Sequence, residues 1–263
     1  MSERVPRFTK DQIGTSAVRF PSGIPMPSMT DASVDPYIKT RVPKEVLVEG
    51  LLFGPQETGP FPGLILLHEA WGLTAQIKDL GSRLAQEGYV VLIPNLYSRQ
   101  GGMVTANAEI AQALAERVKE ADLMQDLNSA CEFLNSRDHV IRNVHGVVGF
   151  GLGGSLAIRF ACLRKRLRGA VAFYGLPPNL PEGLRDLACP LLYHQAGADT
   201  QVPADSAERL KQAATAAGKQ VDIRTYAGAP HAFMNETRPD SYRPEAAHDA
   251  FETTIQFLKD HVK

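Results

Sequence analysis

The stretch VVGFGLGGS, residues 147–155, is the most informative part of this sequence. An apolar run of strand length ends in a glycine-rich turn, and a helical pattern follows directly. A sharp turn between a strand and a helix is where many enzymes hold a Ser or Cys nucleophile. Here Gly151 stands at the centre of the turn, and glycine tolerates the strained backbone of such a position. Covalent catalysis needs a side-chain atom, so the sequence predicts no covalent nucleophile at this turn.

On both sides of this turn, apolar runs alternate with amphipathic helical patterns. The runs GLILL (63–67) and YVVLIP (89–94) are typical of strands buried on both faces. Further strands are expected at 145–150, 168–175, 189–197 and 220–226. Helices are expected at 74–88, 153–165, 206–218 and 246–262, with a helical region over about 104–136 that breaks into two. This alternation predicts an α/β fold with a mostly parallel central sheet and helices on both faces.

The chain divides into two parts by composition. Residues 1–44 are rich in Pro, Ser, Thr and charge, and they are predicted to form an extended N-terminal arm. Residues 45–263 are predicted to form one α/β domain. Its first segment, EVLVEGLLF (45–53), alternates enough to predict an antiparallel edge strand.

Composition excludes several classes of function. The 263 residues are 44% hydrophobic and 22% charged, with a formal net charge of −1, so no basic surface for nucleic acid is expected. No apolar run is long enough to cross a membrane, and the N-terminus lacks a secretory signal. The cysteines at 131, 162 and 189 are scattered and lack metal-ligand spacing. A cytoplasmic protein without metal or cofactor is therefore the expectation, whereas the oligomeric state is not fixed by the sequence.

The loops after the predicted strands carry the chemistry, because ligands of parallel sheets bind beyond the carboxyl ends of the strands. Asp199 lies in AGADTQVP and His231 lies in AGAPHAF, both after the glycine turn. The order of nucleophile turn, Asp and His is that of a catalytic triad on an α/β sheet. An Asp that accepts from one imidazole nitrogen fixes the tautomer and leaves the other nitrogen free to act as a base.

Five motifs in order, LLHEAWGL, IPNLYSRQ, VVGFGLGG, GADTQVP and YAGAPHAFMNETRPDSY, closely resemble the dienelactone hydrolase family of α/β-hydrolases. The resemblance runs from about residue 45 to 262. It implies the α/β-hydrolase fold and a metal-free hydrolase of small esters or lactones that bear a carboxylate. The resemblance also implies a Cys-His-Asp triad, but Gly151 occupies the cysteine position here.

Carried over residue by residue, the resemblance implies that His231 is the base and Asp199 its orienting carboxylate. It implies that Glu69 lies beside the nucleophile position and that Arg99 binds the substrate carboxylate. A second arginine is expected a few residues after the histidine, where Asn235 stands instead.

Backbone groups and aromatic side chains complete the expected site. The resemblance places the oxyanion hole at the backbone N–H groups of Ala70 and Leu152. Trp71 and Tyr97 are expected to form walls of the substrate pocket, or else to pack the loops.

Several alternatives remain open at this stage. His231 could activate a water molecule in place of a nucleophile, or the chain could be an inactive homologue that binds or senses a small organic acid. Ser155 could replace the nucleophile, but it lies one helical turn into the following helix. A dinucleotide-binding loop is disfavoured, because GFGLGG follows a late strand and no acidic residue ends the next one.

Overall fold

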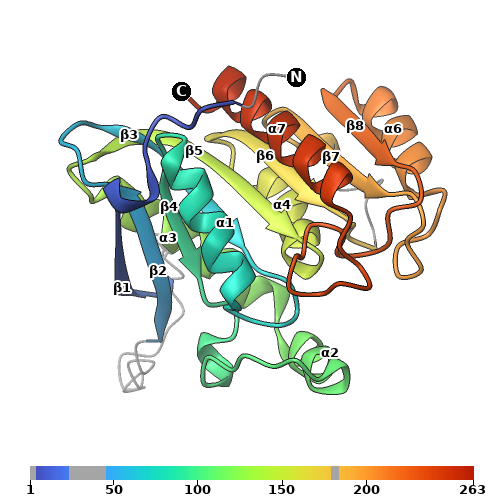
Figure 1. The fold of residues 1–263 in the computed structure, drawn as a ribbon, viewed down its shortest axis with the longest axis horizontal. Coiled ribbons are helices and arrows are strands. Elements are labelled where there is room, and N and C mark those ends of the chain that lie inside the picture. Colours follow the sequence, from blue (N-terminus) through green and yellow to red (C-terminus); the bar gives the residue numbers. More distant parts are fainter. Residues whose placement is uncertain (1–3, 24–45, 179–183) are drawn as a thin grey trace, which may run out of the picture.

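The structure is a computed structural model that describes residues 4–23, 46–178 and 184–263. Its centre is an eight-stranded sheet in the order β1-β2-β4-β3-β5-β6-β7-β8 (Figure 1). The strands are β1 (Ile13–Pro21), β2 (Leu47–Pro55), β3 (Phe61–Leu67), β4 (Val90–Pro94), β5 (Val140–Phe150), β6 (Leu167–Phe173), β7 (Leu191–Ala196) and β8 (Val221–Tyr226). Six strands, in the order β4, β3, β5, β6, β7 and β8, are parallel to one another. Among the residues that the structure describes, only the β1–β2 and β2–β4 pairs are antiparallel. The predicted mostly parallel sheet is confirmed.

The edge of the sheet differs from the prediction. β2 was expected at the edge, but β1 pairs with it along its whole length, from Ile13 opposite Pro55 to Pro21 opposite Leu47. β1 belongs to the segment that was predicted as an extended arm. Residues 24–45, which include the boundary predicted between arm and domain, lie outside the described residues.

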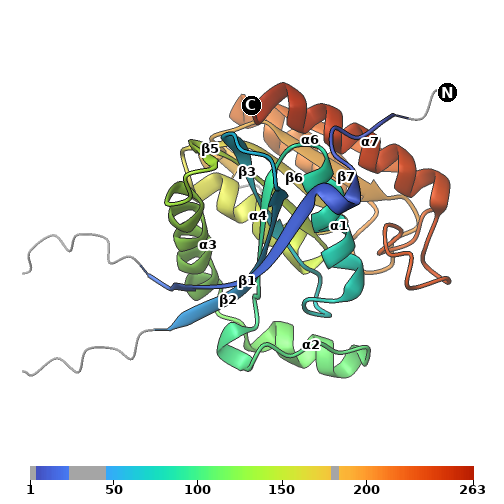
Figure 2. The ribbon, with the colours of Figure 1, turned by 60° about the vertical axis from the view of Figure 1, so that its left-hand side comes forward.

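Helices cover both faces of the sheet, as predicted. One apolar cluster joins α1 (Ala75–Gln86) and α7 (Pro244–His261) to the sheet, and the other joins α3 (Glu120–Asn135), α4 (Leu152–Leu163) and α6 (Ser206–Ala217) (Figure 2). The short 3-10 helices are η1 (Lys10–Gln12), η2 (Ser98–Gln100) and η3 (Leu184–Asp186). None of the helices in the described part of the chain combines the length and apolar character that crossing a membrane requires.

The core explains why the central strands read as continuous apolar runs. In β3, Leu64 and Leu66 belong to the cluster under α1 and α7, whereas Ile65 and Leu67 belong to the opposite cluster. All four side chains are fully buried. Successive side chains of a strand point to opposite faces, so a strand covered on both faces must be apolar at every position. Each such burial contributes about 1.5–3 kcal/mol.

The parallel arrangement brings six loops to one edge of the sheet. These loops follow β3, β4, β5, β6, β7 and β8, and they begin near residues 68, 95, 151, 174, 197 and 227. Helix α2 (Ala108–Arg117) lies beyond the same edge, apart from the two layers of helices (Figures 1 and 2). The predicted region over 104–136 thus does break into two helices, α2 and α3.

Candidate active site

Gly151 forms the turn between β5 and α4. Its backbone has φ +51° and ψ −113°, and its N–H donates to the carbonyl of Phe173 at 3.0 Å. A Cβ atom built on Gly151 would lie 3.5 Å from His231 Nε2 and 3.9 Å from Glu69 Oε1. A side chain at this position would therefore point between an imidazole and a carboxyl group.

The other glycines of the turn have a different cause. A Cβ on Gly149 would lie 2.0 Å from the carbonyl oxygen of Gly153, and a Cβ on Gly153 would lie 2.4 Å from that of Leu67. These contacts are with backbone that cannot move aside, so glycine is required where β3, β5 and α4 meet. Packing does not require glycine at 151, because the nearest neighbour there is a side chain at van der Waals distance.

His231 and Asp199 are brought together as the sequence predicts. His231 Nδ1 lies 2.9 Å from Asp199 Oδ2, and the other oxygen of Asp199 accepts from the backbone N–H groups of Gln201 (2.8 Å) and Val202 (3.1 Å). Burial raises the pKa of Asp199, but these hydrogen bonds outweigh it and the pKa lies below its ordinary value. The ionised Asp199 holds the proton on Nδ1, so Nε2 faces the turn as an acceptor.

Strained backbone surrounds this imidazole. Tyr174 and Ala232 adopt φ +36° and +62°, values that side-chain-bearing residues rarely take, and both line the pocket beside His231. The Tyr174 ring meets the His231 ring at 4.9 Å, nearly edge-on. Each such backbone conformation costs on the order of 1–3 kcal/mol, so packing must hold both residues in place.

Glu69 is a buried carboxyl group at the start of the loop after β3. Only 6% of the residue is exposed, and its Oε2 accepts from Asn235 Nδ2 at 3.2 Å. Its Oε1 has no hydrogen-bond partner among the described residues. Burial raises the pKa of Glu69, while His231 opposes the shift. The structure thus places Glu69 beside the turn, as the resemblance implies, and gives Asn235 a role as its donor.

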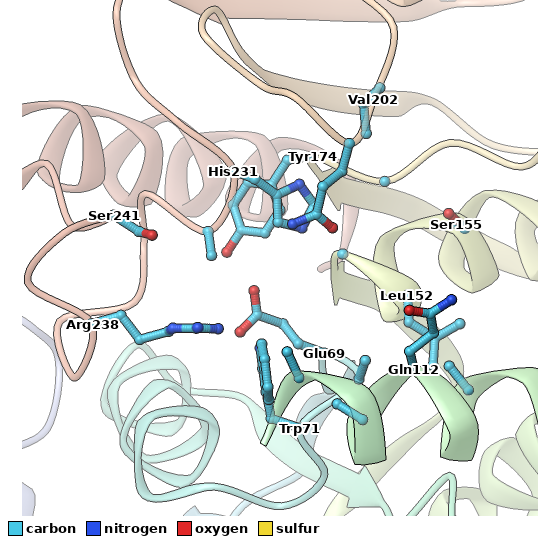
Figure 3. Close-up of a pocket in the computed structure, with 18 of the residues that line it drawn as sticks. Glu69, Trp71, Gln112, Leu152, Ser155, Tyr174, Val202, His231, Arg238 and Ser241 are labelled. Carbon is cyan, nitrogen blue, oxygen red and sulfur yellow. The ribbon is translucent and has the colours of Figure 1, made fainter. Parts of the chain in front are cut away.

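These groups open into a cavity of about 680 Å³ (Figure 3). Ala70, Trp71 and Leu152 line it, together with Glu69 and His231. Leu152 is the first residue of α4, where backbone N–H groups have no partner within the helix and the helix dipole is positive. Ala70 and Leu152, whose amides the resemblance implies as the oxyanion hole, thus both line the cavity.

Arg238 is a pocket residue that the sequence analysis missed. Its guanidinium lies 4.1 Å above the Trp71 ring and points into the cavity toward Glu69 (Figure 3). A second arginine was expected near position 235 and was judged absent. Seven positions separate Arg238 from His231 in the sequence, within the motif MNETRPDSY, and the fold of this loop returns it to the site.

Arg99 does not reach this cavity, contrary to the prediction that it binds substrate. Its guanidinium pairs with the buried carboxylate of Asp126 on α3 and donates to Ser22 Oγ at 2.8 Å. Asp122 lies 3.8 Å away as well. Arg99 therefore ties the loop after β4 to α3 and to the end of β1.

The Tyr97 side chain packs between loops and does not line the cavity. It is fully buried, and its hydroxyl donates to the carbonyl of Ala70 at 2.9 Å. His68 supports the same region: its Nε2 accepts from Leu96 N–H at 3.0 Å and its Nδ1 lies 2.6 Å from the Glu69 carbonyl. These bonds fix the backbone around Ala70. Of the two aromatic residues expected to form walls, Trp71 lines the cavity and Tyr97 does not.

Helix α2 forms the remaining wall of the cavity, which the sequence did not predict. The residues that face the cavity are mostly small: Ala108, Ala111, Gln112 and Ala115. Ser155 lines the cavity too, one turn along α4 and away from His231 (Figure 3). Across the described ranges, no three His, Cys, Asp or Glu side chains come together in a way that could hold a metal ion.

Comparison with known proteins agrees with this architecture. The profile of the family described as "Dienelactone hydrolase family" matches residues 48–262. A Methylorubrum extorquens protein assigned as a carboxymethylenebutenolidase is 35% identical over 218 residues, which cover 79% of this chain and 75% of that one. The protein named usf of Aquifex pyrophilus is 32% identical over 226 residues, 82% of this chain and 95% of that one.

A solved structure assigned as a dienelactone hydrolase from Klebsiella pneumoniae superimposes with a TM-score of 0.77. It is 26% identical, and the match covers 94% of this chain and all of that one. The chain therefore belongs to the dienelactone hydrolase family and is a dienelactone hydrolase-like hydrolase with the α/β-hydrolase fold.

Proposed function

We propose that this protein hydrolyses small carboxylic esters or lactones that bear a carboxylate, with water as the attacking nucleophile. One observation carries the proposal: the position of a Cβ on Gly151 lies 3.5 Å from His231 Nε2. Gly151 offers no side-chain nucleophile, yet the imidazole and its partner Asp199 keep the geometry of a general base. A water molecule in the place of a nucleophilic side chain lies within reach of that base.

The proposed reaction needs only groups of this chain and one water molecule. His231 Nε2 removes a proton from the water as its oxygen attacks the carbonyl carbon. The N–H groups of Ala70 and Leu152 stabilise the oxyanion of the tetrahedral intermediate. When this collapses, the C–O bond to the leaving alkoxide breaks, and the alkoxide takes the proton from the imidazolium. Asp199 stabilises the imidazolium throughout.

Arg238 supports a substrate with a carboxylate. Its guanidinium lies over the Trp71 ring at 4.1 Å and lines the cavity, where its N–H groups can bind a carboxylate in a bidentate manner. Arg99, the residue first expected to do this, is engaged by Asp126. A substrate carboxylate at Arg238 would leave the carbonyl to be attacked near Gly151.

A second function is favoured by the glycine itself. Without a nucleophilic side chain, the same cavity could bind a small organic acid through Arg238 and release it unchanged. In that case, the His231–Asp199 pair would be retained without turnover.

One experiment separates the two functions. p-Nitrophenyl acetate and an unsaturated γ-lactone carrying a carboxylate are incubated with the wild type, His231→Ala and Gly151→Cys. Water-based hydrolysis predicts wild-type turnover that falls by about 10²–10⁴-fold in His231→Ala. If only Gly151→Cys turns over substrate, the binding function replaces the proposed one.

A further inference from the structure

We propose that two copies of this chain pair through strand β8, edge to edge and antiparallel, so that their two sheets continue as one. β8 is the last strand of the sheet, and no strand among the described residues pairs with its outer side (Figure 1). An unpaired strand edge presents a row of N–H and C=O groups to which another strand can bind. This inference goes beyond the hydrolytic function proposed above and does not depend on it.

The hydrogen bonds between β7 and β8 show which backbone groups of β8 are free. The carbonyls of Gln220 and Tyr226 accept from the N–H groups of Leu191 and Gly197, so the even-numbered residues of β8 direct their backbone groups toward β7. Backbone groups of successive residues in a strand point to opposite sides. The residues whose N–H and C=O groups face outward are therefore Val221, Ile223 and Thr225.

This edge lacks the features that usually protect a strand from a second one. The sequence of β8, VDIRTY, contains neither proline nor lysine, and the strand pairs with β7 in unbroken register. Its two charged residues have opposite signs: the side chains of Asp222 and Arg224 are each 55% exposed. They line an open hollow of about 310 Å³ beside α7, so the helix does not cover them. A second copy therefore meets an open edge without net charge.

The two charges favour one register of the pair. When Ile223 lies opposite Ile223 of the second copy, Asp222 of each copy faces Arg224 of the other. The outward backbone groups then form the hydrogen-bonded pairs, and the charged residues form the non-hydrogen-bonded pairs, in which side chains lie closer. Opposite charges in directly opposed positions stabilise an antiparallel pair. Pairs centred on Val221 or Thr225 would leave both charges without an opposed charge.

The other edge of the sheet offers no such match. Strand β1, with the sequence IGTSAVRFP, carries a single charged residue, Arg19. Arg19 already pairs with Glu49 on β2 at 2.8 Å. Two antiparallel copies of β1 would bring no opposite charges together, so the structure favours β8 as the interface.

Charge exchange tests the proposed register. Sedimentation velocity over a range of concentrations should show the wild type as a dimer, with twice the mass of one chain. Asp222→Arg and Arg224→Asp should each weaken the dimer by about tenfold or more, because like charges then face each other. An equal mixture of the two variants should recover a dimer, since the charges of one chain then oppose those of the other. Misfolding of either variant could not produce this recovery.

Thr225→Pro tests the backbone pairing separately. Thr225 is exposed and its N–H faces outward, so proline removes a hydrogen bond to the second copy and none to β7. The variant should be monomeric at concentrations at which Thr225→Ala, the matched control that keeps the N–H, is a dimer. Thermal unfolding checks that both variants fold.

Three results would overturn the proposal. A wild type that stays monomeric at millimolar concentration has no such interface. A dimer that persists in Thr225→Pro and in both single charge variants forms through another surface. If the single charge variants are monomeric and their mixture stays monomeric as well, the opposed charges do not set the pairing.

None of these results bears on ester hydrolysis, which is measured separately.

Discussion

His231 and Asp199 lie on separate loops after β8 and β7, and a hydrogen bond of 2.9 Å joins Nδ1 of the imidazole to Oδ2 of the carboxylate. The Asp199 side chain is 2% exposed and that of His231 19% exposed, so one member of the pair is sealed from water and the other faces the cavity. This is the arrangement of a base held by a buried anion.

Replacing Asp199 with Asn tests the role of that anion. The amide can present N–H to the imidazole and favour the wrong tautomer, so ester hydrolysis should fall by about 10²–10⁴-fold in kcat with little change in KM. Steady-state kinetics with p-nitrophenyl acetate measures the effect. Asp205→Asn is the control, because Asp205 starts α6 without a side-chain cap bond. Equal losses in the two variants would contradict a specific role for Asp199.

Replacing Arg238 with Ala tests the carboxylate anchor. KM for an ester that carries a carboxylate should rise by about tenfold or more, while KM for a neutral ester of similar size stays within about twofold. Arg238→Lys should restore part of the affinity, since it keeps the charge but not the planar fork. An equal rise of KM for both esters would mean that Arg238 only shapes the loop above Trp71.

Arg99→Ala should destabilise the fold and leave turnover per folded molecule unchanged. The variant removes the cation that pairs with Asp126, whose side chain is only 4% exposed. Leaving a buried carboxylate without its partner costs about 3 kcal/mol or more of the free energy of unfolding. Urea unfolding gives the free energy of unfolding. Arg166→Ala, at an exposed position, should change it by less than about 0.5 kcal/mol. A carboxylate-specific rise in KM in Arg99→Ala would return Arg99 to the substrate site.

Buried histidines should make the protein sensitive to acid. Burial lowers the pKa of His194 to about 3, and that of His68 and of His145 to about 4, from an ordinary value of 6.5. Below pH 6.5 these histidines are therefore protonated in the unfolded chain but stay neutral in the folded chain. The free energy of unfolding should fall as the pH drops from about 6.5 toward 4, by up to about 1.4 kcal/mol per pH unit for each histidine.

His194→Gln isolates one of these contributions. His194 is held by Tyr226 Oη and Thr254 Oγ1, both at 3.0 Å, and glutamine can keep part of this bonding without titrating. Urea unfolding between pH 4.5 and 7.5 should show a shallower loss of stability for this variant. The exposed His248→Gln should keep the wild-type slope. Identical slopes for His194→Gln and the wild type would contradict the prediction.

The central fold was predictable because its signals are local. The strand at 63–67 and the helix at 74–88 are recognisable from apolar spacing alone, and both are confirmed as β3 and α1. β1 was missed because most of its side chains are exposed or half-buried, so it lacks an apolar pattern. Its partner β2, which supplies the backbone hydrogen bonds, is a distant segment.

The candidate site was predictable only where motif order is enough. His231, Asp199, Glu69 and the Gly151 turn lie together because parallel strands end at one edge of the sheet. Arg99 was predicted to bind substrate and does not line the cavity, whereas Arg238 was not predicted and does line it. No local pattern reveals this difference. Arg99 contacts a carboxylate on α3, and Arg238 is returned to the cavity by the loop before α7.

The sequence by itself determined the alternation of strands and helices, the side of the sheet on which the chemistry lies, and the glycine at the nucleophile turn. Tertiary structure alone decided which arginine lines the cavity, that α2 forms one wall, and that Asn235 donates to the buried Glu69 carboxyl. The reason is physical. Apolar periodicity is a property of short segments and can be recognised from each segment alone. The partner of a charged side chain depends instead on which distant segments the packed core brings within a few ångströms of it.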